Sequence, residues 1–209
     1  AIAQSMAKNG CPPEKIKVLP HGIPIHSNTS ECTHQLKENQ GDLQFFYVGR
    51  VCRVKGVHVM LEAFSALHGN AGLHIIGGAA NKKYRKDQRI IWHGKVEPNR
   101  INEQIAQYDV MIHPAICLEV FGLNIAEALS LGKPVIATRC GGPEMQVQDG
   151  VNGWLVTPND VGSLEQALQK FVRGGETIKN FRVIHSDKEP ITIDKHVNKL
   201  IKVYEKNIN

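Results

Sequence analysis

Two glutamates, Glu119 and Glu127, stand eight positions apart around a Phe-Gly pair. The apolar run 110–113 before them predicts a strand, and a helix is predicted to begin near Gly122. A helix that begins at the carboxyl end of a parallel strand can bind phosphate, because its first N–H groups are unpaired and lie at the positive end of its dipole. Carboxylates before the helix and roughly 7–8 Å along its axis can each bind hydroxyl groups. The segment therefore predicts a site for phosphate flanked by two sets of hydroxyls, as in a nucleotide sugar.

The two carboxylates would lie on either side of the bound phosphate, with the ribose toward Glu127 and the sugar toward Glu119. The unpaired N–H groups between them belong to Phe121, Gly122, Leu123 and Asn124. The alternative is that Glu127 lies on the solvated face of its helix and that Glu119 is an ordinary loop carboxylate. We favour binding, because Glu127 stands between Ala126 and Ala128 in a helix of small apolar residues, which suits a buried acid with a specific partner.

A basic loop follows the predicted strand 44–48. Gly49 permits a tight turn there, and Arg50 and Lys55 flank the loop before the next helix. Arginine offers a planar fork to phosphate and lysine a compact charge, so the two together could neutralise a diphosphate without a metal ion. The chain has no Asp-x-Asp pair to hold Mg²⁺ or Mn²⁺, and we predict no metal site. The alternative is a surface loop whose cations are solvated.

Other strand ends offer weaker signals. Backbone groups that could meet a flat base belong to Gly94, Lys95 and Val96. The adjacent His93 could act as a catalytic base, although a lone loop histidine is weak evidence. After the strand 73–76 the glycines do not form the dinucleotide fingerprint G-x-G-x-x-G, so a turn is expected there. Glu144 is expected to cap its helix rather than to touch a ligand.

The composition is that of an ordinary globular protein, with 209 residues, 42% hydrophobic and 22% charged. No apolar run approaches the roughly 20 residues that span a bilayer, and no signal peptide is recognisable, so a cytoplasmic location is expected. The five cysteines form no C-x-x-C pair, which argues against zinc and for a reducing compartment. The net charge of +5 is mild, and we interpret the basic run 82–89 as a solvated loop rather than a contact for an anionic ligand or a membrane. Because the chain does not begin with methionine, we expect it to be part of a longer protein.

Strands alternate with helices along most of the chain. Strands are predicted at residues 15–19, 44–48, 73–76, 89–92, 110–113, 134–137 and 154–156. Helices are predicted at 56–67, at 98–107, from 122, from 143, from 159 or 160 to 171, and at 193–207. This alternation predicts an α/β fold: a Rossmann-like, mostly parallel sheet with helices on both faces.

Three regions are expected along the chain. Residues 1–43, punctuated by prolines, would form an interdomain connection and the first strand of the domain. Residues 44–185 would form a nucleotide-sugar-binding Rossmann-like domain, and residues 186–209 a C-terminal helix. The apolar side chains of that helix are expected to face inward; they are Val197, Leu200, Ile201 and Tyr204.

Taken in chain order, these motifs resemble the carboxyl-terminal, donor-binding half of a retaining glycosyltransferase with the GT-B fold, of the family 4 type (glycosyl transferases group 1). The resemblance runs through nearly the whole chain, and the ordered set is specific although each motif alone is weak. The motifs are 17–23, Val48-Gly49-Arg50 with Lys55-Gly56, Trp92-His93-Gly94, His113-Pro114, 119–127, 141–144 and 149–156. Two positions depart from the family pattern: His21 stands where asparagine is common, and the usual G-G-x-P-E is shortened at 141–144.

The resemblance implies a role for each site residue. Arg50 and Lys55 would bind the donor diphosphate beside Gly49 and stabilise the leaving group. Glu119 would hold hydroxyls of the transferred sugar, and Glu127 would bind the ribose. Backbone contacts are implied for 121–124 with the phosphate and sugar, and for 94–96 with the base.

Such an enzyme would move a hexose from a UDP-, GDP- or ADP-sugar to a carbohydrate or lipid-linked acceptor, with retention and without a metal ion or cofactor. In this fold the acceptor binds to an amino-terminal domain that the chain lacks, so the chain alone is expected to bind donor and to transfer little. The full enzyme could associate peripherally with the inner face of the cytoplasmic membrane.

Two other classes of protein stay open from the residues themselves. One is a regulatory module that binds a nucleotide and catalyses nothing, and the other is a sugar-nucleotide epimerase of related architecture. The presence of all four residues with implied side-chain roles favours the transferase; they are Arg50, Lys55, Glu119 and Glu127. A nicotinamide-dependent oxidoreductase is disfavoured, because its glycine fingerprint and the acid that follows are missing.

Overall fold

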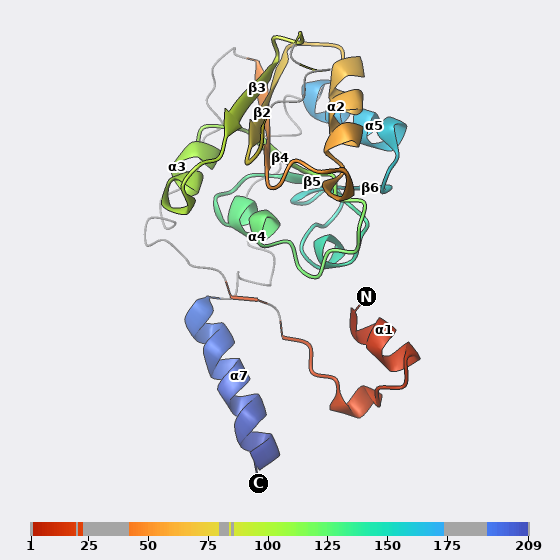
Figure 1. Ribbon diagram of the computed structural model, residues 1–209, viewed down its shortest axis with the longest axis vertical. Coiled ribbons are helices and arrows are strands. Elements are labelled where there is room, and N and C mark those ends of the chain that lie inside the picture. Colours follow the sequence, from red (N-terminus) through yellow and green to blue (C-terminus); the bar gives the residue numbers. More distant parts are fainter. Residues whose placement is uncertain are drawn as a thin grey trace.

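The computed structural model describes residues 2–19, 21–22, 42–79, 84, 86–173 and 192–208. Within them, six strands form one sheet in the order β3-β2-β1-β4-β5-β6 (Figure 1). The strands are β1 (Leu43–Val48), β2 (Ala71–Ile76), β3 (Ile90–Gly94), β4 (Val110–His113), β5 (Val135–Thr138) and β6 (Gly153–Val156). All neighbouring strands run parallel. This is the strand order of the Rossmann fold, so the predicted α/β architecture is confirmed.

Helices cover both faces of this sheet (Figure 1). They are α2 (Val57–Ala66), α3 (Ile101–Ile105), α4 (Leu123–Ser130) and α5 (Val161–Arg173). Helices α2 and α5 pack over Phe45 and Tyr47 of β1, whereas α3 and α4 pack over Phe46 and Val48. Successive side chains of a strand point to opposite faces, so a strand that is covered on both sides is apolar at successive positions, as β1 is from Phe45 to Val48.

Short 3-10 helices join several of these elements. They are η1 (Pro13–Lys15), η2 (Arg53–Lys55), η4 (Pro98–Arg100) and η5 (Gly142–Met145). The helix predicted at 98–107 is therefore η4 followed by α3. Glu144 caps η5 as predicted, since its carboxylate accepts a 3.0 Å hydrogen bond from the N–H of Gly141. Asp160 caps α5 in the same way, by accepting a 3.0 Å hydrogen bond from the N–H of Ser163.

Gly56 brings the loop after β1 close to the end of β4. It lies between η2 and α2 with a φ of 68°, and a Cβ atom placed on it would lie 1.7 Å from the carbonyl oxygen of Pro114. Glycine is required at such a position, because any side chain would clash with the backbone and strain the left-handed conformation. The close approach of Gly56 to Pro114 carries the preceding residue, Lys55, to the carboxyl end of β4.

The amino-terminal region differs from its prediction. It contains α1 (Ile2–Lys8) and η1, and the described part of residues 1–43 contributes no strand before Leu43. Residues 15–19 alternate as a strand would, but no strand among the described residues pairs with them. The prediction of a strand at residues 15–19 is therefore wrong. In the basic run 82–89, Lys82, Lys83 and Arg85 lie outside the described residues, so the interpretation of this run as a solvated loop stays a prediction.

The C-terminal helix forms as predicted, as α7 (Ile193–Ile208), but only Leu200 of the four side chains predicted to face inward is half-buried, and the other three are exposed. Val197, Ile201 and Tyr204 are 43%, 47% and 60% exposed. Figure 1 shows α1 and α7 beyond the sheet domain rather than on either face of the sheet. Helical periodicity predicts which side chains share a face, but it does not specify the surface against which that face packs.

Candidate functional site

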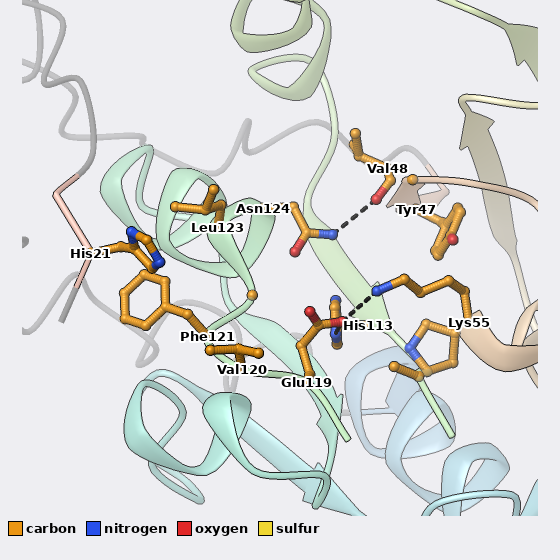
Figure 2. A pocket seen from close by; sticks show the side chains of 14 residues that line it. His21, Tyr47, Val48, Lys55, His113, Glu119, Val120, Phe121, Leu123 and Asn124 are labelled. Carbon is orange, nitrogen blue, oxygen red and sulfur yellow. Dashed lines mark hydrogen bonds and ion pairs between the residues drawn. The ribbon is translucent and has the colours of Figure 1, made fainter. Parts of the chain in front are cut away.

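A cavity of about 330 Å³ lies at the carboxyl ends of β1 and β4 (Figure 2). These strands are neighbours in the sheet but not consecutive in the chain, and open α/β sheets bind ligands at such a switch in strand order. The cavity is lined by His21, Tyr47, Val48, Gly49, Lys55, His113, Pro114, Ala115, Glu119, Val120, Phe121, Gly122, Leu123 and Asn124. The structure thus brings together most of the predicted site: Gly49, Lys55, Glu119 and residues 121–124.

Lys55 and Glu119 form an ion pair in this cavity (Figure 2). Their Nζ and Oε2 atoms are 2.5 Å apart, and their side chains are only 23% and 19% exposed. The backbone of Glu119 is held by two hydrogen bonds: its N–H donates to Cys140 at 2.8 Å, and its carbonyl accepts from Gly142 at 2.7 Å. The sequence predicted that Lys55 would contact phosphate and Glu119 a sugar, but not that the two would contact each other.

His113, the last residue of β4, lies beside this ion pair. Its side chain is almost fully buried, and its Nε2 atom is 3.7 Å from Oε2 of Glu119. Within the described part of the chain, neither ring nitrogen has a hydrogen-bond partner. Burial lowers the pKa of His113 to about 4; the charge of Lys55 acts in the same direction, whereas that of Glu119 opposes it. The imidazole is therefore neutral at pH 7.

Asn124 fastens the first turn of α4 to the end of β1. Its Nδ2 atom donates a 2.9 Å hydrogen bond to the carbonyl oxygen of Val48. Gln146 supports the turn before the helix by donating to the carbonyl oxygens of Phe121 and Gly122. These bonds hold the amino end of α4 against the cavity, as Figure 2 shows for Asn124.

The first N–H groups of α4 are available to a ligand. Gly122 precedes the helix with a φ of 84°, and no side chain of the described residues caps this end. The N–H groups of Gly122, Leu123 and Asn124 make no hydrogen bond within the described parts of the chain. Unpaired N–H groups at the positive end of a helix attract anions, so this wall of the cavity suits phosphate.

Arg50 and Tyr47 lie at the end of β1. The side chain of Arg50 is exposed and does not line the cavity, while its carbonyl oxygen accepts a 2.7 Å hydrogen bond from the hydroxyl of Tyr47. Burial raises the pKa of Tyr47, so the phenol is protonated and can donate this bond. Tyr47 therefore fixes the turn that carries Arg50.

The remaining predicted residues lie outside this cavity. Lys95 and Val96 line a second cavity of about 300 Å³, between the end of β3 and α3. Its other lining residues are Glu97, Arg100, Glu103, Gln104 and Gln107. Gly94 ends β3, and Glu127 is half-buried on α4 rather than fully buried. A ligand that reached all the predicted residues would extend beyond the first cavity.

His93 is engaged in a side-chain cluster rather than free to act as a base. Its Nε2 atom is 2.9 Å from Nδ1 of His74 and 3.2 Å from the hydroxyl of Tyr108, and its Nδ1 atom is 3.1 Å from the amide of Gln104. None of these residues lines the first cavity. The weaker interpretation of His93 as a catalytic base is therefore not supported.

Seven of the cavity residues were not assigned a site role from the sequence, and three of these carry a polar ring: His21, Tyr47 and His113. His21 lies edge-on to the ring of Phe121, with 5.6 Å between ring centroids. His113 had one usable signal, because it is a polar residue that ends an otherwise apolar strand. Among the described residues, no three His, Cys, Asp or Glu side chains are grouped to hold a metal ion. None of the described helices is both long and apolar enough to cross a bilayer.

Residues 29–184 match the sequence model of the family described as glycosyl transferases group 1. The chain belongs to this family. It is 28% identical over 208 residues to the lipopolysaccharide 1,6-galactosyltransferase of Escherichia coli K12, covering 92% of this chain and 54% of that protein. It is 29% identical over 181 residues to the putative colanic acid biosynthesis glycosyltransferase WcaL of Salmonella typhimurium, covering 78% and 44%. The chain thus spans about half the length of these curated relatives.

Solved structures of glycosyltransferases share the fold. The Anabaena protein HepE in complex with UDP superimposes with a TM-score of 0.79 at 22% identity, over 98% of this chain and 61% of HepE. The C-terminal domain of the group 1 glycosyl transferase LpcC from Francisella tularensis superimposes with a TM-score of 0.61 at 22% identity, over 88% of this chain and 98% of that one. The sheet domain therefore has the Rossmann-like fold of GT-B glycosyltransferases.

Proposed function

We propose that this group 1 glycosyltransferase chain is the donor-binding half of its enzyme and binds a nucleoside-diphosphate sugar. The observation that carries the proposal is one cavity in which the Lys55–Glu119 pair lies beside the N–H groups at the start of α4, which donate to no other described residue. These groups supply a cation, a carboxylate and an anion-binding helix end at a single switch in strand order. The cavity volume lies at the lower end of the range for small-molecule sites.

The phosphates would occupy the amino end of α4. The N–H groups of Gly122 to Asn124 would bind their oxygens, and Lys55 would neutralise part of their charge. Arg50, which is exposed on the adjoining turn, would reach the diphosphate from the side. When the bond to the sugar breaks, negative charge builds up on the diphosphate, and fixed donors stabilise charge that develops in a transition state. This arrangement would support transfer with retention and without a metal ion.

The sugar and the nucleoside would lie on opposite sides of the phosphates. Glu119 would accept hydrogen bonds from sugar hydroxyls, and Glu127 from the ribose. The base would meet the backbone of residues 94–96, where the second cavity begins. HepE, which shares the fold, has been solved with UDP and with UDP-glucose, and this supports UDP as the first nucleotide to test.

The acceptor would be a carbohydrate or lipid-linked molecule held by a second domain. The chain corresponds to only about half of its curated relatives, two of which are named for lipopolysaccharide and colanic acid synthesis. We therefore expect the 209-residue chain to bind a donor and to transfer hexose only when joined to an acceptor-binding domain. Its place of action would be the cytoplasm or the inner membrane face.

Calorimetric titration of the 209-residue chain with UDP, GDP and ADP tests the donor site. One nucleotide should bind, and Lys55→Ala and Glu127→Ala should each weaken it by about 1–3 kcal/mol, or roughly 5- to 150-fold, as lost charged hydrogen bonds do. Lys202→Ala and Glu205→Ala, exposed positions on α7, are the matched controls and should leave affinity unchanged. No binding of any of the three at millimolar concentration would contradict the proposal.

A further inference from the structure

The imidazole of His113 lies against the Lys55–Glu119 pair, but neither of its ring nitrogens is hydrogen-bonded to another described residue. Only 3% of the residue is exposed, and both ring nitrogens lack a hydrogen bond to the described residues. Buried polar atoms in native proteins are nearly always paired, so an unpaired imidazole at the wall of a cavity calls for an explanation. Its Nε2 atom lies 3.7 Å from Oε2 of Glu119.

A single carboxylate oxygen stands between two potential cations. Oε2 of Glu119 is 2.5 Å from Nζ of Lys55, which is hydrogen-bond distance, and 3.7 Å from Nε2 of His113, which is not (Figure 2). With Lys55 in place, the carboxylate needs no second cation, and the nearby ammonium charge opposes protonation of the imidazole. The neutral state of His113 thus depends on where Lys55 lies.

The other groups around His113 do not supply a charge. From α4, the amide of Asn124 carries no charge, although its hydrogen-bonding group favours the protonated ring and so raises the pKa of His113; from β5 the hydroxyl of Thr138 lies 3.4 Å from the carbonyl oxygen of His113. Beyond Glu119 lie the phenol of Tyr47 and the thiol of Cys140, whose pKa values are raised by burial, so both are neutral near pH 7. Among the described residues, Lys55 and Glu119 are therefore the charges that act on the imidazole, in addition to its burial.

A diphosphate at the amino end of α4 would change this balance. Lys55 would turn toward the phosphates, which removes the nearest cation from Glu119 and adds negative charge nearby. Both changes favour a protonated imidazole. A charged N–H···O contact has a length of about 2.7–2.9 Å, so Nε2 and Oε2 would need to approach by only about 1 Å.

We propose that His113 is a positioning residue that replaces Lys55 as the cationic partner of Glu119 when the site binds a nucleoside diphosphate. The inference rests on the proposed function, because it requires Lys55 to engage the diphosphate. One proton leaves the buffer and forms an N–H bond on the imidazole; no covalent bond to the ligand forms or breaks. Glu119 then stays in place for the sugar hydroxyls, and the proton returns to solvent when the nucleotide leaves.

The test counts protons taken up on binding. The 209-residue chain is titrated at pH 7.5, in two buffers of different ionisation enthalpy, with whichever of UDP, GDP and ADP binds. On binding, the wild type should take up close to one proton more than His113→Gln. For each pH unit by which the pH is lowered, the nucleotide affinity of the wild type should therefore rise by up to tenfold more than that of the variant. Comparison with the variant cancels protons that belong to the terminal phosphate. His68→Gln, at an exposed position, should behave as the wild type does.

Equal proton uptake by the wild type and His113→Gln would overturn the inference, while binding itself would leave the donor site standing. If none of the three nucleotides binds, the proposed function is contradicted, and this inference, which depends on it, is contradicted as well. Thermal unfolding checks that His113→Gln folds, and His113→Asn serves as a second variant. Independently of any variant, the ¹⁵N shifts of the His113 ring in the wild type should change from a neutral to a protonated pattern on nucleotide binding. A neutral pattern in both states would also overturn the inference.

Discussion

Two histidine regions of the same sheet, one half-buried and one buried, contrast in how their ring nitrogens are paired. On β2 and β3, His74 and His93 lie 2.9 Å apart, and each has at least one further side-chain partner. On β4, His113 is more deeply buried but has no partner within the described residues. The first region forms a closed polar cluster, whereas the second leaves its polar atoms at the wall of a cavity.

The contacts of the first region determine its tautomers. Gln44 donates its amide to the carbonyl of Asp42 at 2.8 Å, so its oxygen faces Nε2 of His74 as an acceptor. His74 must then donate from Nε2 and accept at Nδ1 from His93. The amide of Gln104 completes the chain by donating to Nδ1 of His93. Every ring nitrogen is satisfied only while both imidazoles are neutral.

Burial has a different consequence in each region. In the paired cluster, protonation of His74 or His93 would place two N–H groups against each other, so the contacts stabilise one protonation state. In the unpaired region, protonation of His113 would create a contact with Glu119 that the neutral ring lacks. A polar cluster whose hydrogen bonds are all made is typical of a structural element, whereas an unpaired buried group beside a cavity indicates a role in binding.

The largest expected difference comes from two glycines, one beside each region. Gly56 and Gly94 have nearly the same left-handed φ, 68° and 69°, but a Cβ on Gly56 would clash with Pro114, whereas one on Gly94 would meet no atom within 4 Å. Gly94→Ala should therefore lose only the conformational term of about 1–2 kcal/mol, and Gly56→Ala about 2–5 kcal/mol because overpacking is added. Urea denaturation measures both. Equal losses would show that the backbone near Pro114 yields to the new side chain.

Acid should destabilise the folded protein through both regions, because in each a histidine binds a proton more readily in the unfolded than in the folded state. The pKa of a histidine in the unfolded chain is about 6.5, and burial lowers the pKa values of His74 and His113 to about 4. Between these values the unfolded state binds more protons, so the free energy of unfolding falls as the pH falls from 6.5 toward 4. The loss should be at most about 3 kcal/mol for His113, and less for the half-buried His74, where water screens the charge.

Denaturation at pH 7, 6 and 5 of the wild type, His74→Gln and His113→Gln separates the two contributions. Each variant should flatten the pH dependence. A saturating nucleotide should remove the contribution of His113, whose proton is then taken up in the folded state, and leave that of His74. A nucleotide that affected both equally would indicate a general stabilisation rather than a local change at His113.

Most of the fold could be predicted from the sequence because its signals are local. The apolar runs of β1, β2 and β4, the first two followed by the glycines Gly49 and Gly77, specify strands that are buried on both faces. The prediction was wrong at residues 15–19 and at the inward face of α7, where the outcome depends on a partner. A strand needs a neighbouring strand to complete its hydrogen bonds. Residues 15–19 have the alternating pattern of a strand, but they form none because no strand among the described residues pairs with them.

The site could be predicted in its residues but not in its contacts. Lys55 and Glu119 were singled out by their positions at strand ends, yet their ion pair depends on the approach of Gly56 to Pro114. The role of His113 depends on which atoms surround its ring, and neighbouring residues in the sequence do not specify this. Long-range contacts of this kind leave no spacing pattern.

His74→Gln should affect stability without affecting binding. The variant loses the imidazole that bridges Gln44 and His93, so about 1–2 kcal/mol of stability should be lost as their hydrogen bonds are rearranged. The nucleotide affinity should stay within twofold of the wild type, because His74 lines neither cavity. His113→Gln, in contrast, should change the number of protons taken up on nucleotide binding, as measured by calorimetry. Altered proton uptake by His74→Gln would remove the contrast between the two regions.

The smallest effect is expected from Tyr108→Phe. The ring of Tyr108 stacks on that of His74, with 4.1 Å between centroids, and the variant keeps this contact. Only the hydroxyl near Nε2 of His93 is removed, at 3.2 Å, and that nitrogen still has His74 as a partner. The loss of stability should therefore be below about 1 kcal/mol in urea denaturation. A larger loss would mean that the hydroxyl, rather than the His74–His93 bond, holds the cluster together, and the closed chain of neutral imidazoles would then be the wrong description of this region.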